Sequence, residues 1–324
     1  MLKLLMIREK IKEIYSTKGV FIDPVIRFLI TLVSLLIINS QIGALAILTS
    51  PVVVIGLSAV GAILTKKFAV MLILVCMIGH IYAIDAFSAL VVLVSYIIMY
   101  LLFFRFSSKY SYVLVAVPLL FFAKIPFVMP VLLGLMASPV AIIPMVFGTL
   151  IYFYLNYFTL NYDKLISANS EEATDTIMNM VNNVFKNPTF FYTVMVFALV
   201  IGLVYFVKRL SVDYSWLVSA IAGGLLATLA MLIGCNLFDM STVYTMPMVI
   251  VGGLVSTILA WLLQFFVHSV DYSRTEYTQF EDDEYYYYVK AVPKIQVVSA
   301  EKNIKRINAR KVSAGTKNKD KRRR

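Results

Sequence analysis

Long apolar stretches separated by short polar segments fill residues 24–267 of the 324-residue chain. Most approach the roughly 20 residues that a helix needs to cross a bilayer core of about 30 Å, although several are shorter. The pattern predicts an all-α polytopic membrane protein with about eight transmembrane helices. The eight or nine stretches are Val25–Ser40, Gly43–Leu64, Phe68–Ala83, Phe87–Phe104, Tyr112–Met129, Pro130–Phe158, Pro188–Val207, Tyr214–Phe238 and Thr245–Val267.

The residues before the first stretch have the spacing of an amphipathic helix. Four apolar side chains share one face of a helix over residues 2–17: Leu4, Ile7, Ile11 and Ile14. We expect residues 1–23 to lie on the cytoplasmic surface of the membrane, with Gly19 and Pro24 turning the chain into the bilayer. A helix that binds a partner protein is the alternative interpretation.

Lysine and arginine are concentrated in alternate connections, which predicts the topology because such residues favour the cytoplasmic side. The basic segments are the N-terminus, Lys66–Lys67, Arg105–Lys109, Lys208–Arg209 and the C-terminal tail. The 159–187 segment carries four acids against two lysines and is expected to be external. Abundant Ile, Lys, Asn and Tyr indicate a low-GC bacterial source. We therefore expect a multi-pass protein of the bacterial plasma membrane with cytoplasmic N- and C-termini.

The apolar region 112–158 has an awkward length for this topology. Its 47 positions correspond to roughly 70 Å of helix, which is too long for one crossing and short for three. Prolines interrupt it, and non-helical backbone is tolerated inside a membrane where protein covers it. We expect one crossing followed by a re-entrant hairpin over 130–158, with its tip near Ala137–Pro144. That gives eight crossings, and nine or ten remain alternatives.

A weak internal repeat surrounds three prolines. The sequence from Thr49 to Gly56 resembles that from Thr245 to Gly252, and a looser copy starts at Ala137. Transporters often have interrupted helices at matching positions of their repeats, with the binding site at the breaks. This pattern suggests a solute path near Pro51, Pro139 and Pro247. Chance similarity is the alternative, since a small residue before proline is common in apolar helices.

Few ionisable residues lie inside the apolar stretches, where a charge costs about 2.5–3.5 kcal/mol. Lys124 is the strongest candidate, either as a buried cation for an anionic solute or as a residue of the outer interface. His80 and Asp85 lie five residues apart and suggest a proton-relay pair. The alternative for both is an ordinary interfacial turn.

Small residues recur every four positions in the last two stretches. Such rows allow helix backbones to approach closely in lipid, where no hydrophobic force drives helices together. We expect these two spans to pack tightly together. The rows are Ser219, Gly223 and Ala227 on one span, and Gly252 with Ser256 and Gly253 with Thr257 on the other.

Motifs for catalysis are missing from the sequence. It has no His-Glu-x-x-His, Gly-x-Ser-x-Gly, Walker A or Gly-x-Gly-x-x-Gly motif. The two cysteines, Cys76 and Cys235, are far apart and form no metal-binding cluster with histidine. We expect no catalytic residue, no metal and no cofactor, and so a protein that is not an enzyme.

The character of the chain changes after residue 267. An alternating segment, an acidic turn and a run of four tyrosines predict a cytoplasmic β-hairpin within residues 268–300, with a disordered segment as the alternative. Residues 301–324 contain eleven basic residues against two acids and are expected to be disordered. The final basic residues should contact anionic lipid headgroups or a partner: Lys319, Lys321, Arg322, Arg323 and Arg324. Nucleic acid is disfavoured because no aromatic residue is interleaved.

Two functions fit these features. Proline-broken spans favour a transporter-like permease subunit or solute channel within the transmembrane domain, residues 24–267. The scarcity of buried charge favours a membrane scaffold or regulatory subunit that recruits a cytoplasmic partner through its tail. An ATPase subunit, another cytoplasmic protein or a second copy of the chain are the partners considered.

Overall fold

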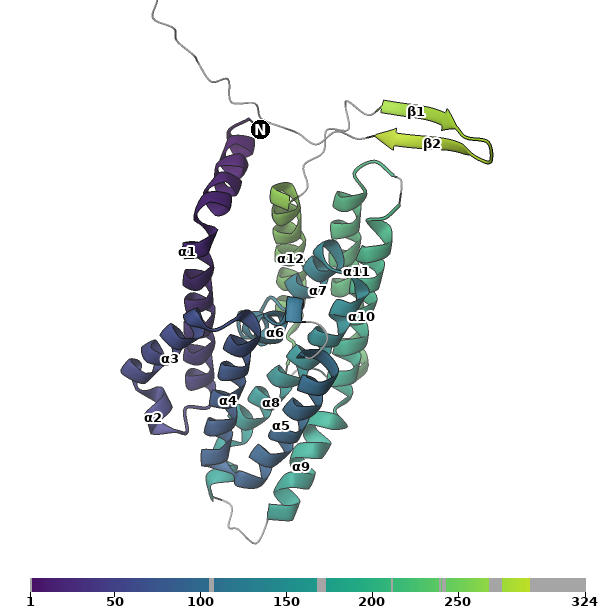
Figure 1. Ribbon diagram of the computed structural model, residues 1–324. Helices are drawn as coiled ribbons and strands as arrows, with labels where there is room; N and C mark the ends of the chain where they lie inside the picture. Colours follow the sequence, from purple (N-terminus) through teal and green to yellow (C-terminus); the bar gives the residue numbers. More distant parts are fainter. Residues whose placement is uncertain are drawn as a thin grey trace, which may run out of the picture.

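A computed structural model shows the protein as an elongated bundle of helices with a small β-hairpin beside one end (Figure 1). It describes residues 2–104, 108–167, 173–210, 212–238, 240, 243–267 and 276–291. The longer helices are α1 (Leu2–Gln41), α3 (Pro51–Ile63), α4 (Lys66–Ile84), α5 (Ala86–Met99), α8 (Ile142–Ser167), α9 (Ala173–Phe185), α10 (Pro188–Val207), α11 (Ser215–Phe238) and α12 (Met246–Val267). The shorter ones are α2 (Ala46–Thr49), η1 (Tyr100–Phe104), η2 (Ser108–Tyr110), α6 (Val113–Phe122), α7 (Val128–Met136) and η3 (Pro139–Ala141).

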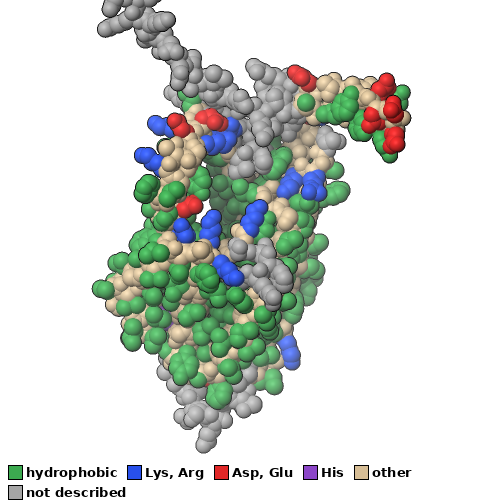
Figure 2. Space-filling view, in the orientation of Figure 1, with side chains coloured by type: hydrophobic (Ala, Val, Ile, Leu, Met, Phe, Trp, Pro, Cys, Tyr) green, Lys and Arg blue, Asp and Glu red, His purple; other side chains and the backbone are tan. Residues whose placement is uncertain are grey.

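Seven membrane-length apolar segments occur among the described residues, within or overlapping α1, α4, α5, α8, α10, α11 and α12. The predicted fold class, an all-α polytopic membrane protein, is therefore confirmed. Lysine and arginine side chains gather toward the end of the bundle that carries the N-terminus and the β-hairpin (Figure 2). The surface of the other half is mostly apolar in this view. We call the end that carries the N-terminus and the β-hairpin the basic end.

Helices α2 and α3 form a shorter apolar segment in addition to the seven membrane-length segments. At the end of α1 remote from the N-terminus, the Asn39 side chain donates a hydrogen bond to the carbonyl of Leu48 at 2.9 Å. Nearer the basic end, the Arg27 guanidinium donates to the carbonyl of Leu64 at 2.6 Å. The chain from 46 to 64 therefore runs antiparallel to α1 and returns toward the basic end. The number of membrane-length segments among the described residues is thus seven, one fewer than the eight predicted, because α3 has only 13 residues.

The predicted turn between an N-terminal surface helix and the first span is wrong. Helix α1 continues from Leu2 to Gln41 with Pro24 inside it. Proline removes one backbone donor and its ring crowds the carbonyl four residues earlier, yet the helical path continues through Pro24. The Tyr15 hydroxyl donates to Asp23 Oδ1 at 2.8 Å, and Arg27 Nε donates to the carbonyl of Asp23 at 3.3 Å. The segment before Pro24 thus extends α1 instead of forming a separate helix.

The predicted re-entrant hairpin over 130–158 is also misplaced. Residues Pro139–Asp163 form one long apolar segment that contains most of α8. Helix α7 packs on α10 and α12 and does not pair with α8 as a hairpin partner. The bend at 137–141 lies where the chain enters α8. Prolines at 139 and 144 occupy the first turns of this long segment, where a missing backbone donor is tolerated. The short, interrupted helices are instead α6 and α7.

The predicted β-hairpin is present. Strands β1 (Glu276–Glu281) and β2 (Tyr286–Ala291) pair antiparallel, with Glu281 opposite Tyr286 nearest the turn. The Lys290 ammonium pairs with Asp213 in the connection between α10 and α11, which links the hairpin to the basic end. Asp282 closes the turn by accepting from the backbone N–H groups of Glu284 and Tyr285 at 2.9 and 2.6 Å. The rest of the predicted tail, residues 292–324, lies outside the described residues.

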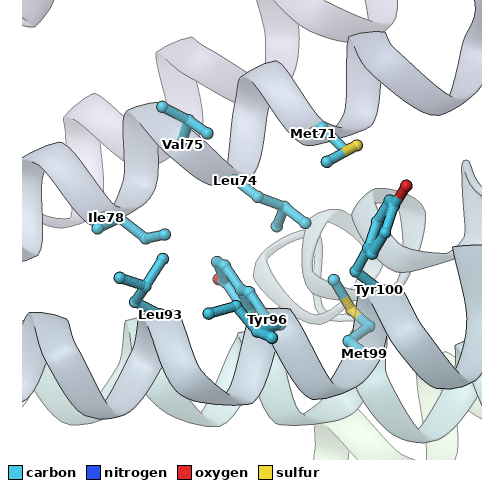
Figure 3. A pocket seen from close by; sticks show the side chains of 9 residues that line it. Met71, Leu74, Val75, Ile78, Leu93, Tyr96, Met99 and Tyr100 are labelled. Carbon is cyan, nitrogen blue, oxygen red and sulfur yellow. The ribbon is translucent and has the colours of Figure 1, made fainter.

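Two apolar grooves flank α5. One of about 270 Å³ lies between α4 and α5 (Figure 3). The other, about 340 Å³, lies between α5 and the pair formed by α8 and α9. The first is lined by Met71, Leu74 and Ile78 of α4 and by Leu93, Tyr96 and Tyr100 of α5 and η1, among others. Helix α5 is therefore incompletely covered by its neighbours.

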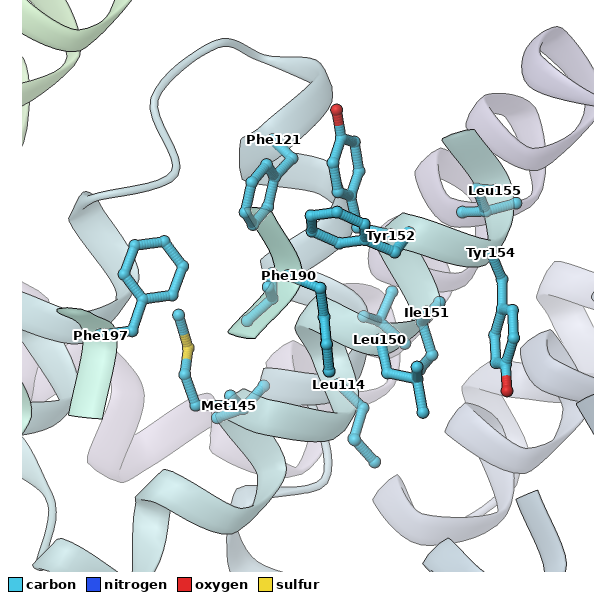
Figure 4. Close-up of a cluster of buried hydrophobic side chains, with 14 of the residues drawn as sticks. Leu114, Phe121, Met145, Leu150, Ile151, Tyr152, Tyr154, Leu155, Phe190 and Phe197 are labelled. Carbon is cyan, nitrogen blue, oxygen red and sulfur yellow. The ribbon is translucent and has the colours of Figure 1, made fainter. Parts of the chain in front are cut away.

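The core of the bundle is rich in aromatic side chains (Figure 4). The rings of Phe121 and Tyr152 are stacked with centroids 4.1 Å apart, and Phe153 and Phe190 meet edge to face at 5.4 Å. These residues come from α6, α8 and α10, so the aromatic cluster joins the short helix α6 to two long ones. Offset and edge-to-face ring contacts add about 0.5–1.5 kcal/mol each beyond burial.

Candidate functional site: the re-entrant tip

Helices α6 and α7 form a re-entrant pair that starts and ends at the basic end. Val117 and Phe121 of α6 lie against Gly148 and Tyr152 of α8, so the two helices run parallel in register. The ten residues of α6 measure about 15 Å, half the apolar thickness of a bilayer. Helix α7 then returns along the second half of α10. The connection between α6 and α7 therefore lies about midway along the long helices α8 and α10, near Tyr152 and Phe197.

This connection, residues 123–127, is the re-entrant tip. Lys124 has a φ of 64°, in the left-handed region that residues with a Cβ rarely occupy. Its backbone N–H donates to the carbonyl of Phe121 at 3.0 Å, and that of Ile125 donates to Leu120 at 2.9 Å, which closes the end of α6. Pro126 cannot donate a backbone hydrogen bond, so the helix does not continue.

Helix α12 passes directly beside the tip. A Cβ on Gly252 would lie 3.2 Å from the carbonyl oxygen of Lys124 and 3.3 Å from the ring of Phe127. Glycine at this position therefore allows the close approach. The Lys124 side chain is exposed, and among the described residues its ammonium has no hydrogen-bond or ion-pair partner.

Aromatic side chains surround the other side of the tip. Phe127 stacks on Tyr244 with ring centroids 6.2 Å apart and meets Phe197 of α10 edge to face at the same distance. The Tyr244 hydroxyl is buried and lies 3.2 Å from the Thr193 hydroxyl, so it has a hydrogen-bond partner. The tip thus has a packed aromatic side and an exposed cationic side.

Lys208 binds the C-terminal end of α7, at the basic end of the bundle. The sequence did not reveal this role. The Lys208 ammonium donates to the carbonyls of Gly134, Leu135 and Ala137 at 2.8, 2.8 and 3.2 Å. These carbonyls belong to the C-terminus of α7, where a cation complements the helix dipole. Burial lowers the pKa of Lys208, and the charge of Arg209 lowers it further. The sequence signal was only a basic pair after an apolar stretch.

The three prolines of the predicted solute path do not meet at one site. Pro51 and Pro139 begin α3 and η3, and Pro247 is the second residue of α12. Proline favours such positions because the first turn of a helix needs no backbone donor. The repeated sequence therefore corresponds to a helix-start signal. Lys124 lies beside α12, but Pro51 belongs to α3, which packs mainly on α1.

His80 and Asp85 take part in separate local contacts. The backbone N–H of Leu45 donates to Nδ1 of the buried His80 at 3.2 Å, which ties the α1–α2 connection to α4. Asp85 caps α5 by accepting from the backbone N–H of Ser88 at 2.7 Å. Neither contact joins the two side chains to each other.

The small residues of α11 and α12 lie in tight helix contacts. A Cβ on Gly223 would lie 2.2 Å from Val204 of α10. Between α11 and α12, Gly224 lies against Thr257 and Gly253 lies against Thr228, so the predicted row of Gly253 and Thr257 is part of this contact. Ser219, Ala227 and Ser256 are buried as well. The predicted lipid-contacting residues, 319 and 321–324, lie outside the described residues.

The described part of the chain contains no group of three or more residues that could hold a metal ion. Cys76 is buried, Cys235 is half-buried, and both are free. The site is thus that of a polytopic membrane protein with a re-entrant helix pair. No family model, curated protein or solved structure matches the chain.

Proposed function

We propose that the protein is a transporter-like permease subunit or solute channel whose path follows the re-entrant tip. The observation that carries this proposal is the exposed Lys124 side chain at the break between two short apolar helices, which we infer to lie near the middle of the membrane. A lysine facing lipid at this depth costs about 2.5–3.5 kcal/mol on the mildest scale. A water-filled vestibule beside the tip removes that cost.

The chemistry of the tip favours an anionic solute. Lys124 supplies a cation, and no carboxylate of the described residues neutralises it. Broken helices at membrane depth are found where backbone lines a cavity or is covered by protein. Here Phe127 and α12 cover one side of the tip, and the exposed side is available to a solute.

Accessibility of position 124 tests the vestibule directly. In a chain whose Cys76 and Cys235 are replaced by alanine, Lys124→Cys should react with a charged, membrane-impermeant thiol reagent. The matched control is Leu225→Cys, because Leu225 is 57% exposed near the middle of α11. A thiol in hydrocarbon does not ionise and should stay unreacted. Equal, slow reaction at both positions would contradict a vestibule.

Flux of small anions tests the function. Full-length protein in proteoliposomes should pass at least one of chloride, phosphate and acetate, and Lys124→Gln should reduce that flux about tenfold or more. Lys186→Gln removes a positive charge far from the tip and should leave the flux unchanged. Unchanged flux in the Lys124 variant would reject the tip as the path.

A membrane scaffold is the second candidate, and the β-hairpin favours it. Its tyrosines are strongly exposed, with Tyr277 at 75% and Tyr288 at 78%. Exposed aromatic side chains on a two-stranded hairpin fit a peptide or protein partner. Deleting residues 276–291 should then remove a co-purifying cytoplasmic partner, whereas Lys124→Gln should retain it. Transport is favoured if deleting the hairpin removes no partner while Lys124→Gln reduces the anion flux.

The remaining expectations belong to the same proposal. We propose that both termini lie in the cytoplasm of a bacterial cell and that the protein is non-catalytic. Active pumping would need a separate ATPase subunit, because the chain carries no Walker A motif. Protease added outside intact cells should leave the C-terminal tail uncut, and cleavage there would reverse the orientation.

A further inference from the structure

The groove between α4 and α5 continues at the basic end into a cationic position. Met71, Leu74, Val75 and Ile78 form one stripe along α4, and Lys67 precedes this stripe by one helical turn. From Met71 to Ile78 the stripe is about 10 Å long. An apolar wall therefore extends from the basic end part of the way toward the middle of the membrane.

Aromatic contacts hold the Lys67 ammonium over the mouth of this groove. Its Nζ lies 4.8 Å from the ring centroid of Tyr100 and 6.0 Å from that of Phe68, both within the usual cation–π range. Tyr100 also lines the groove, where its ring stands beside Met71 (Figure 3). Among the described residues, Lys67 forms no ion pair.

The interior of the groove suits a hydrocarbon chain. Its lining side chains are apolar except for two tyrosines, and the Tyr96 hydroxyl is already used as a donor to Met77 Sδ at 3.0 Å. Tyr100 opens a π-helical turn, η1, and such turns often occur at functional sites. Val75 is 62% exposed, so the groove opens to the outer surface of the bundle.

We propose that the α4–α5 groove binds an anionic phospholipid, with one acyl chain along the apolar stripe and the phosphate on Lys67. Charge complementarity identifies an anionic lipid as the occupant. Lys67, which has no ion-pair partner among the described residues, lies at the mouth of a groove lined by hydrocarbon side chains. A neutral apolar molecule would bring no counter-ion for the Lys67 ammonium, whose contacts here are with aromatic rings. A second copy of the chain would need a carboxylate placed opposite Lys67.

Lipid binding to purified protein tests this site. The full-length chain in neutral detergent is titrated with phosphatidylglycerol and with phosphatidylcholine of identical acyl chains, and bound lipids are counted by native mass spectrometry. Phosphatidylglycerol should bind more tightly. Lys67→Gln should weaken it about fivefold, the factor expected for one basic group at an anionic headgroup.

A bulky side chain in the groove tests lipid binding independently of the charge of Lys67. Val75→Trp should weaken phosphatidylglycerol binding, and folding should persist because this side chain is largely exposed. The matched controls are Lys186→Gln for the charge and Leu225→Trp for the bulk, and both should bind as the unmodified protein does. The basic tail is the same in every variant, so differences between them report on the groove.

Three results would overturn the proposal. They are equal affinity for the two lipids, an unchanged affinity in Lys67→Gln, and a dimer that Val75→Trp dissociates without altering lipid binding. The last result would identify the groove as an interface between two copies of the chain.

Discussion

Helices α7 and α10–α12 are joined by close backbone contacts, whereas α4 and α5 leave grooves between their side chains. In the first region, glycines bring helices together, as at Gly134 against Val204 and Gly224 against Thr257. In the second, apolar side chains line open space of about 270 Å³. Lipid is as apolar as these side chains, so burial alone does not drive helices together. The closeness of packing therefore distinguishes the region of α7 and α10–α12 from the grooved region of α4 and α5.

The largest expected effect comes from adding one methyl group in the tight region. A Cβ on Gly134 would lie 2.6 Å from Val204 Cβ and 3.2 Å from the backbone carbonyl of Ile201. Gly134→Ala should lower the free energy of unfolding by about 1–3 kcal/mol. Gly202→Ala is the control, because a Cβ there meets nothing within 4 Å and alanine favours helix. Denaturant titration in micelles measures the free energy of unfolding of both variants. Equal stability of the two variants would contradict the tight packing at Gly134.

A smaller effect is expected from a matched pair of valines. Val200 is fully buried on α10, while Val75 lines the groove and is 62% exposed. Val200→Ala should destabilise the protein by about 1–2 kcal/mol through lost packing, and Val75→Ala should change it by less than about 0.5 kcal/mol. Similar losses at the two positions would mean that the groove is as tightly packed as the core.

Lys208 tests how firmly the re-entrant pair is fixed. Lys208→Gln removes the charge from three carbonyls at the end of α7 and should cost about 1 kcal/mol, since the side chain is only partly buried. Arg209→Gln, next to it and exposed, should cost less. Thiol reactivity of Lys124→Cys in the Lys208→Gln background reports whether the tip loosens. Unaltered reactivity would restrict Lys208 to a local contact.

The β-hairpin extends the comparison to a region with almost no burial. The Tyr287 hydroxyl and the turn N–H groups of Glu284 and Tyr285 lower the pKa of Asp282. The ionised carboxylate therefore stabilises the hairpin above the unfolded-state pKa near 3.8, and this stabilisation is lost as pH falls through the lower folded-state value. Amide exchange at Tyr285 should rise in that window, and Asp282→Asn should show no such pH dependence.

Sequence patterns predicted the fold class and the hairpin because both depend on local periodicity. They did not place the re-entrant pair, because Tyr112–Met129 and Pro130–Phe158 are uniformly apolar and hydropathy does not record where a chain reverses. Proline has opposite meanings in the two settings: Pro139 starts a long segment, while Pro126 ends a short helix. Position relative to a helix start decides between them, and composition does not contain that information.

The candidate site was predicted only in part. Lys124 was identified as the most informative charge, and the structure gives it a left-handed backbone at the re-entrant tip. Its neighbours Gly252, Phe127 and Tyr244 come from distant segments, so no local motif could group them. Lys208 was missed because three carbonyl acceptors on another helix leave no trace in the sequence around it.

The uninterrupted helix α1 is longer than one bilayer crossing requires. Forty helical residues measure about 60 Å, twice the apolar thickness of a bilayer. One crossing accounts for about half of this length, and the N-terminal end of α1 lies on the same side of the bundle as the hairpin (Figure 1).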